Sequence, residues 1–204
     1  MVNGKSNEKA RTRNNLFSRL HRLLRQAFGL MMVLGLFLGA NRGICGEPPL
    51  TEYQVKALFL FNFAKYVDWP TDAFADAKTP ITIYLIGENK LGDRLTESVK
   101  GKTINGREII VRRVVKEDVL DQCHILFVNV SEKKHLAEIL VKTKAKPVLT
   151  VGETEQFIQQ GGIINFTKKE GKVRLEINVD SATQSKLQIS SKLLSVADVV
   201  RGKK

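Results

Sequence analysis

The sequence predicts a single α/β domain whose mostly parallel, mixed sheet is flanked by helices. β-rich runs alternate with helical patterns between residues 81 and 160, as is typical of crossover connections between parallel strands. Two later β-rich runs are separated by only four residues, which predicts a C-terminal antiparallel hairpin. A very apolar helical pattern precedes the first strand, and we expect the rest of the fold to pack on it.

Residues 1–46 are expected to be a signal peptide with an extended basic lead-in, and residues 47–204 the folded domain. The uncharged stretch at residues 26–41 follows a basic segment and is shorter than the roughly 20 residues that a membrane span needs. Cleavage after Ala40 and cleavage after Gly46 both fit. An uncleaved inner-membrane anchor and a later start codon remain alternatives.

The net charge of +12 is concentrated in this leader. Residues 1–42 hold eight basic side chains and one acidic one, a balance of +7, which leaves 12 − 7 = +5 for the rest of the chain. A nucleic-acid-binding protein would show a clustered basic face with aromatic residues instead. We therefore expect no nucleic-acid partner.

The first element is a helix over residues 52–67, with Thr51 as N-cap and Gln54 completing a capping box. At 100° per residue, one side of this helix is apolar and is expected to face the core: Val55, Phe59, Phe63 and Val67. A narrow column remains on the other side and is a candidate contact surface: Gln54, Leu58, Asn62, Lys65 and Trp69.

The remaining elements follow from changes in periodicity and from turn residues. Strands are expected at residues 81–86, 108–115, 123–130, 147–151, 163–167 and 172–179, and helices at 91–99, 133–143, 153–160, 181–187 and 191–200. The run at 123–130 is apolar on both faces, so it should be central. Asn105-Gly106 is a turn signal before the second strand, and the hairpin is expected at the sheet edge.

No constellation of catalytic or metal-binding residues stands out. The three histidines are His21, His124 and His135, and Cys123 and His124 should point to opposite faces of one strand. No nucleophile elbow, phosphate-binding loop or paired-acid spacing is present. We expect no enzyme activity, no metal and no cofactor. Cys123 is interpreted as a buried free thiol, although cleavage after Ala40 would leave Cys45 to pair with it.

The hairpin carries a second candidate binding surface. Strict alternation places Arg174, Glu176 and Asn178 on one face of the strand at 172–179, and Ser190 could line the same rim. Arginine offers a rigid fork for a carboxylate or phosphate, so this face could bind a small molecule. The alternative is a solvated face on which Arg174 pairs with Glu176. Asn62, Lys65 and Trp69 are the matching candidates on the first helix, where Trp69 could instead be a core aromatic.

Six blocks in order resemble the YfiR family of periplasmic proteins: YQVKALFLFNFAKYVDWP (53–70), CHILF (123–127), PVLTV (147–151), GGII (161–164), RLEIN (174–178) and ISSKLL (189–194). Together they span almost all of residues 51–200. The resemblance implies an exported α/β domain with Rossmann-like layering, often a homodimer, without established catalytic activity.

The resemblance also implies a function. The best-known member represses a membrane-bound diguanylate cyclase by binding its periplasmic sensor part, and loss of that repression raises cyclic-di-GMP and promotes biofilm formation. Small ligands have been proposed for the family, so a periplasmic sensor or carrier that uses Arg174, Glu176 and Asn178 is the alternative. Relatives under disulfide control have more cysteines than this chain, which puts a redox switch within the monomer in doubt.

Overall fold

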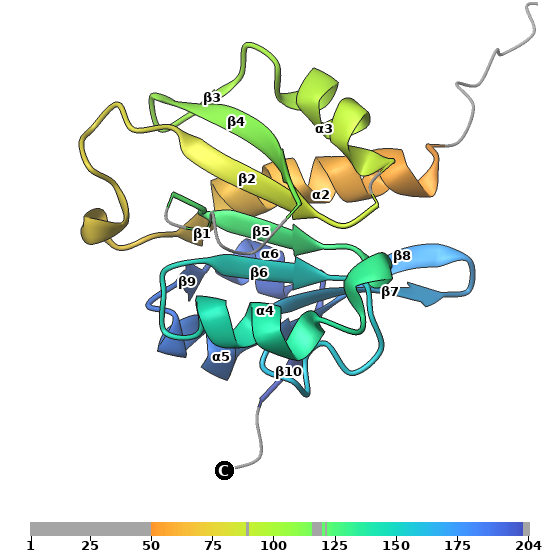
Figure 1. Ribbon diagram of the computed structural model, residues 1–204. Coiled ribbons are helices and arrows are strands. Elements are labelled where there is room, and N and C mark those ends of the chain that lie inside the picture. The colour runs from red at the N-terminus through yellow and green to blue at the C-terminus, as the bar shows by residue number, and fades with distance from the viewer. Residues whose placement is uncertain (1–49, 89, 116–119, 121, 202–204) are drawn as a thin grey trace, which may run out of the picture. The chain divides into compact units, whose positions relative to one another are not determined.

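The computed structural model describes residues 50–88, 90–115, 120 and 122–201, all within one compact unit that begins at Pro49 (Figure 1). The leader expected at residues 1–46, its cleavage points and Cys45 lie outside the described residues. Within them, no helix is both long and apolar enough to cross a membrane.

The first half of the domain follows the predicted order closely. It contains α2 (Glu52–Tyr66), β1 (Val67–Asp68), η1 (Thr71–Ala73), β2 (Ile81–Ile86), α3 (Leu91–Val99), β3 (Thr103–Ile104), β4 (Arg107–Val114) and β5 (Ile125–Val128). The capping box of Thr51 and Gln54 is present, which confirms the predicted start of α2. Asn105 and Gly106 have positive φ and turn β3 into β4, as the turn signal indicated.

The second half contains η3 (Val130–Glu132), α4 (Leu136–Thr143), β6 (Leu149–Gly152), β7 (Ile164–Lys169), β8 (Lys172–Asn178), α5 (Val179–Gln184), β9 (Gln188–Ile189), α6 (Ser191–Leu194) and β10 (Asp198–Val200). Three predictions are wrong here. The helix expected at 153–160 is a series of turns, and the helix expected at 191–200 stops at Leu194. The chain then forms β10, which pairs parallel to β8, so the hairpin is not at the sheet edge.

The main sheet has eight strands in the order β10-β8-β7-β6-β5-β2-β4-β3. The strands from β4 to β7 run parallel, and the two antiparallel pairs are β7–β8 and β3–β4. The fold class is therefore the predicted mixed, mostly parallel α/β domain. β5 lies between β2 and β6, in the central position that its apolar sequence indicated.

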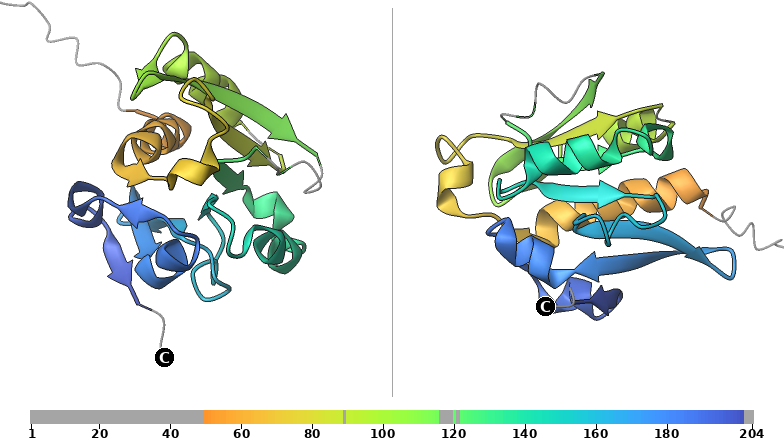
Figure 2. Two further views of the ribbon diagram at one scale, coloured as in Figure 1. Left: turned by 90° about the vertical axis from the view of Figure 1, so that its left-hand side faces the viewer. Right: turned by 60° about the horizontal axis from the view of Figure 1, so that its bottom comes forward.

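Helices cover both faces of the sheet (Figure 2). Two clusters of apolar side chains fill the spaces between the helices and the sheet. α2, α3 and α6 contribute to the larger cluster on one face, whereas α4 contributes to the smaller cluster on the other. Leu60 and Phe63 of α2 are fully buried, and Phe63 stacks on Phe166 of β7 with ring centroids 5.9 Å apart. As expected, the sheet packs on the apolar first helix.

The core-facing side of α2 differs slightly from the prediction. Phe63 and Val67 are buried as expected, but Val55 and Phe59 are only half-buried. Ala57, Leu60 and Ala64 are buried as well, so the core side of the helix is centred on these smaller residues. α3 packs against α2 and covers part of its surface, which the helical pattern alone could not indicate.

Candidate functional site

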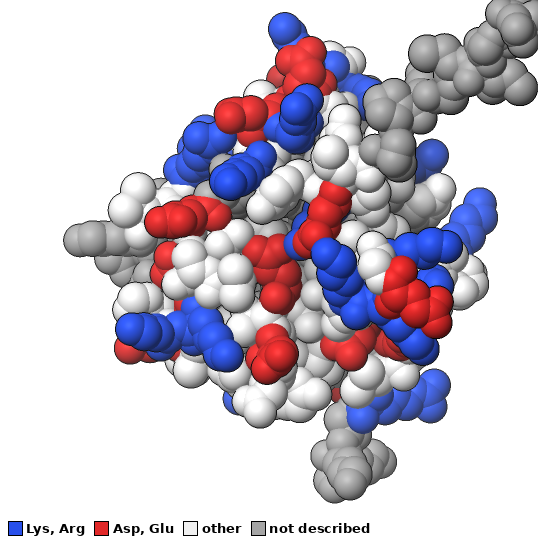
Figure 3. All heavy atoms as spheres, turned by 90° about the vertical axis from the view of Figure 1, so that its right-hand side faces the viewer, with Lys and Arg blue, Asp and Glu red and all other residues white. Residues whose placement is uncertain are grey.

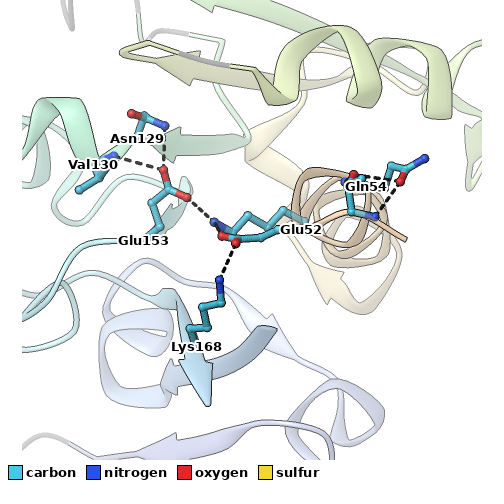
Figure 4. Close-up of polar contacts among 8 residues, drawn as sticks. Glu52, Gln54, Asn129, Val130, Glu153 and Lys168 are labelled. Atoms are coloured by element: carbon cyan, nitrogen blue, oxygen red, sulfur yellow. Dashed lines mark hydrogen bonds and ion pairs between the residues drawn. The ribbon is translucent and has the colours of Figure 1, made fainter. Parts of the chain in front are cut away.

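A buried lysine stands at the end of the sheet where the parallel strands finish. Lys56, on α2, is only 6% exposed. Its Nζ donates to Glu52 Oε1 and to Glu153 Oε2, each at 2.6 Å (Figure 4). Glu52 is one helical turn earlier, whereas Glu153 directly follows β6. The ion pairs therefore join the start of α2 to the carboxyl end of a central strand.

Both carboxylate oxygens of Glu153 accept hydrogen bonds. Its Oε1 accepts from the side-chain amide of Asn129 at 2.7 Å and from the backbone N–H of Val130 at 3.3 Å (Figure 4). Asn129 and Val130 follow β5, so one carboxylate links the ends of β5 and β6 to α2. Glu52 completes the group, because its Oε2 accepts from Lys168 of β7 at 3.3 Å.

The pairing keeps these groups charged. Burial lowers the pKa of Lys56, but the hydrogen bonds and charges of Glu153 and Glu52 outweigh it, so that the pKa lies above its usual value. The hydrogen bond from Lys56 in turn lowers the pKa of Glu52. Lys56 is therefore an ammonium with both strong acceptors already in place, not a free base for catalysis.

A cavity of about 650 Å³ adjoins this group. Its walls come from α2, the loop after β5, the loop after β6, and strands β7 and β8: Glu52, Tyr53, Lys56, Val130, Glu153, Thr154, Glu155, Gln156, Gln159, Asn165, Phe166, Thr167, Lys168 and Glu176. Figure 3 looks onto this end of the molecule, where acidic and basic side chains gather side by side. Ligand sites of parallel α/β sheets also lie at the carboxyl ends of the strands.

Two buried oxygen atoms of the cavity walls have no hydrogen-bond partner among the described residues. These are Oγ1 of Thr154 and Oδ1 of Asn165, whose residues are 2% and 4% exposed. Asn165 Nδ2 donates to Glu176 Oε2 at 3.4 Å. An unpaired buried acceptor is unusual in folded proteins, because it loses its bond to water without a replacement.

The rim formed by the loop after β6 is fixed by an aromatic ring. Phe157 is fully buried, and its ring lies directly against the Cα positions of Gly152 and Gly162. A Cβ on either glycine would come within 2.3 Å of a ring carbon. Gln156 adopts a positive φ of 65°. The left-handed Gln156 and the inserted ring explain why this segment turns instead of forming the predicted helix.

The residues predicted on the hairpin do not come together in one site. Arg174 is exposed and lines a separate depression near residues 195–198, while Glu176 is half-buried in the cavity described above. Asn178 is buried, and its Oδ1 accepts from the backbone N–H of Ser181 at 3.0 Å as the N-cap of α5. Ser190 caps α6 in the same way.

The column predicted on α2 is partly exposed. Leu58 and Lys65 are exposed, and Asn62 is half-buried, so these three form an outer helix face. Trp69 lies beyond the helix end, with its indole edge against His124 at a centroid separation of 6.2 Å. Its Nε1 is buried without a partner among the described residues. Trp69 is thus mainly a packing residue.

The described residues contain no group of three or more His, Cys, Asp and Glu side chains that could hold a metal ion. Cys123 is a buried free cysteine, as predicted, and burial raises the pKa of its thiol. It packs in the smaller cluster, whereas His124 stacks on Phe74 with ring centroids 4.5 Å apart. Both residues precede β5 and line one depression beside Lys146 and Pro147, so the strand alternation on which the prediction of opposite faces rested does not apply to them.

Sequence reasoning missed the Lys56 group entirely. The spacing of Glu52 and Lys56 was a signal, because glutamate four residues before lysine forms a helical ion pair. The placement of Lys56 among apolar residues was another. Glu153 could not be assigned as the partner, since 97 residues separate it from Lys56.

Comparison with known proteins gives a family match and a fold match. A family model described as YfiR/HmsC-like matches residues 53–198. No curated protein matches the sequence.

Two solved structures are similar in fold. One is a conserved domain protein from Vibrio cholerae O1 biovar El Tor strain N16961, with a TM-score of 0.51, 11% identity, and coverage of 75% of this chain and 61% of that one. The other is an ABC domain in complex with L-Trp from Streptococcus pneumonia, with a TM-score of 0.49, 9% identity, and coverage of 72% and 60%. The chain spans about three fifths of the length of each. The first likeness supports the α/β fold alone.

Proposed function

Because this chain belongs to the YfiR/HmsC-like family, we propose that it is a periplasmic regulatory protein that controls an inner-membrane diguanylate cyclase by protein–protein contact. The family match over residues 53–198 is the observation that carries the proposal. It covers the α2 helix, the whole of the parallel sheet and the hairpin. The proposed role is binding, without catalysis and without a cofactor.

The outer face of α2 is the contact surface that we propose. Leu58 is 42% exposed and is flanked by the polar side chains of Asn62 and Lys65. An apolar residue surrounded by polar ones is the usual composition of a small protein–protein contact. Gln54 extends the same face toward the start of the helix. Trp69, the last member of the predicted column, lies beyond the helix end and packs on His124.

The mechanism follows from differential binding. A regulator shifts an enzyme between two states only as far as it binds one state more tightly than the other. We propose that the α2 face binds the periplasmic sensor part of the cyclase in its inactive state. Loss of that contact is then expected to raise cyclic-di-GMP and biofilm formation.

The test is a Leu58→Asp variant in the host strain, with cyclic-di-GMP measured beside a deletion strain. A charge at Leu58 is expected to break an apolar contact, so the variant should match the deletion in nucleotide level. Val141→Asp is the control, because Val141 is also an exposed apolar residue on a helix, at 71% exposure. It lies on α4, on the opposite face of the sheet from α2.

Unchanged nucleotide levels in the deletion strain would contradict the regulatory role itself. If the deletion raises the level and Leu58→Asp does not, the role stands and the α2 surface is the wrong one. Circular dichroism of both variants checks that they are folded.

Export and assembly complete the proposal. Residues 1–46 would be a signal peptide, or an inner-membrane anchor if uncleaved, and residues 47–204 the working domain. The homodimer implied by the resemblance stays a prediction, which analytical ultracentrifugation of the domain tests.

A further inference from the structure

We propose that the cavity at the carboxyl ends of the parallel strands binds a small organic cation through an ammonium group. This site is separate from the outer face of α2, and the inference does not depend on the proposed regulatory function. It rests on the charges that line the cavity, on the two unpaired oxygens in its walls, and on the lack of a metal-binding arrangement there.

The charge balance of the walls favours a cation. Four carboxylates line the cavity (Glu52, Glu153, Glu155 and Glu176) together with two lysines (Lys56 and Lys168), which gives −4 + 2 = −2. This negative site lies in a part of the chain, residues 43–204, whose net charge is +5. An anion would meet a net repulsion here, and a cation a net attraction.

Both lysines are already paired with carboxylates. Lys56 is held between Glu52 and Glu153, each at 2.6 Å, and Lys168 is 3.3 Å from Glu52. The carboxylates of Glu155 and Glu176 have no ion-pair partner among the described residues. Glu176 is held only by the amide of Asn165, at 3.4 Å. The uncompensated charge of the cavity is therefore negative.

The unpaired oxygens point to a ligand that donates hydrogen bonds. The amide of Asn165 is fixed by its contact with Glu176, because a flipped amide would place two oxygens together. Asn165 Oδ1 is left as a buried acceptor, and Thr154 Oγ1 adds a second oxygen without a partner. An ammonium has three donors and no acceptor, which suits this set of groups.

An organic cation fits better than a metal ion. No three carboxylate, histidine or cysteine side chains converge anywhere in the part of the chain that the structure describes. Tyr53, which is 40% exposed, supplies an aromatic wall on which a carbon skeleton can rest. The cavity of about 650 Å³ also falls in the range usual for small-molecule sites, well above the space that a bare ion needs.

The experiment is isothermal titration calorimetry of the full chain with 1,5-diaminopentane as the probe and pentane-1,5-diol as its neutral counterpart. Measurements at 0.15 M NaCl screen attraction at the exposed surface, so binding in the cavity should dominate. We expect saturable binding of the diamine at one site per chain and none of the diol. Equal binding of both compounds, or no binding of the diamine, would overturn the proposal.

Glu176→Gln locates the binding site. It removes one charge at nearly constant shape and is expected to weaken diamine binding by about tenfold or more, the usual effect of losing a charge-assisted hydrogen bond. Glu97→Gln is the matched control, since Glu97 is an exposed acid on α3 outside the cavity. Equal weakening by both variants would reveal general charge attraction and refute the site.

Glu155→Gln is a second variant for the same measurement if Glu176→Gln does not fold. Glu155 is exposed, so the fold is expected to tolerate this substitution. Unchanged affinity in this variant would count against the site. The outcome is also independent of the cyclase. A chain that binds the diamine but leaves cyclic-di-GMP unchanged on deletion would support the cavity and refute the regulatory role.

Discussion

His124 is held in one neutral tautomer by its neighbours. The backbone N–H of Thr82 donates to Nδ1 at 3.2 Å, so that nitrogen must be an acceptor. Nε2 then carries the hydrogen and donates to the carbonyl of Ala73 at 3.1 Å. Burial lowers the pKa of His124, and the nearby Arg107 lowers it further. The ring thereby ties β2 and the segment after β1 together while uncharged.

This arrangement predicts that stability declines with acid. Since the folded pKa lies below the ordinary value of about 6.5, the unfolded chain takes up the proton first as the pH falls. The contribution of His124 is complete at pH 7 and declines as the pH falls below about 6.5, so less of it remains at pH 5. Urea unfolding at pH 7 and at pH 5 measures this difference in unfolding free energy. In a His124→Gln variant the unfolding free energy should no longer decline between these pH values, whereas in His135→Gln it should decline as in the unchanged protein. An equal decline in all three proteins would contradict the attribution to His124.

Lys56 gives a second prediction at this scale. Lys56→Met removes the ammonium and leaves the carboxylate of Glu153, whose side chain is only 10% exposed, without its ion-pair partner, whereas the exposed Glu52 keeps Lys168. We expect a loss of roughly 3–5 kcal/mol in unfolding free energy. Lys65→Met on the same helix is the control and should change stability by less than about 0.5 kcal/mol, because Lys65 is exposed. Chemical denaturation compares the unfolding free energies of the two variants. Similar losses in both would show that the ion pairs of Lys56 add nothing to stability.

The loop between β6 and β7 depends on two glycines. Gly152→Ala would force a methyl group against the buried ring of Phe157, and we expect a loss of about 1–3 kcal/mol. Gly92→Ala is the matched change in α3. There the new methyl group meets only the exposed side chain of Arg113, and helix propensity should offset the contact. Thermal melts of both variants test this; an unaffected Gly152→Ala would mean that the ring moves aside easily.

The elements that the sequence predicted well are those with a strong local signal. The capping box of Thr51 and Gln54 and the helix Leu91–Val99 were both located from spacing alone. The helix expected at 153–160 was wrong, because the packing of Phe157 between glycines is not a local property. The same holds for β10, whose residues form a strand only because β8 lies beside them.

The candidate site was harder to predict than the fold. Arg174, Glu176 and Asn178 alternate correctly on β8, yet α5 begins directly after the strand and uses Asn178 as its cap. The Lys56–Glu153 pair joins residues that only the folded sheet brings together. Periodicity identifies the face on which a residue lies, but it does not identify which neighbour occupies that face.

At the scale of the whole molecule, we predict that residues 47–204 fold alone and do not respond to reductant. Cys123 is buried and burial raises the pKa of its thiol, so little reactive thiolate is present. The melting temperature of this segment should be the same with and without dithiothreitol. Since Cys123 is the only cysteine in this segment, a shift of several degrees would show that a disulfide between two chains contributes to its stability.

The burial of α2 has a consequence for how the chain is made. The partners that cover Leu60 and Phe63 include β7 and β8, which come about a hundred residues later. A ribosome completes α2 well before those strands exist, so the apolar side of this helix stays uncovered during synthesis. If the chain is exported as proposed, α2 also emerges first on the far side of the membrane. A holding chaperone on each side of the membrane would then have its main target in this one helix.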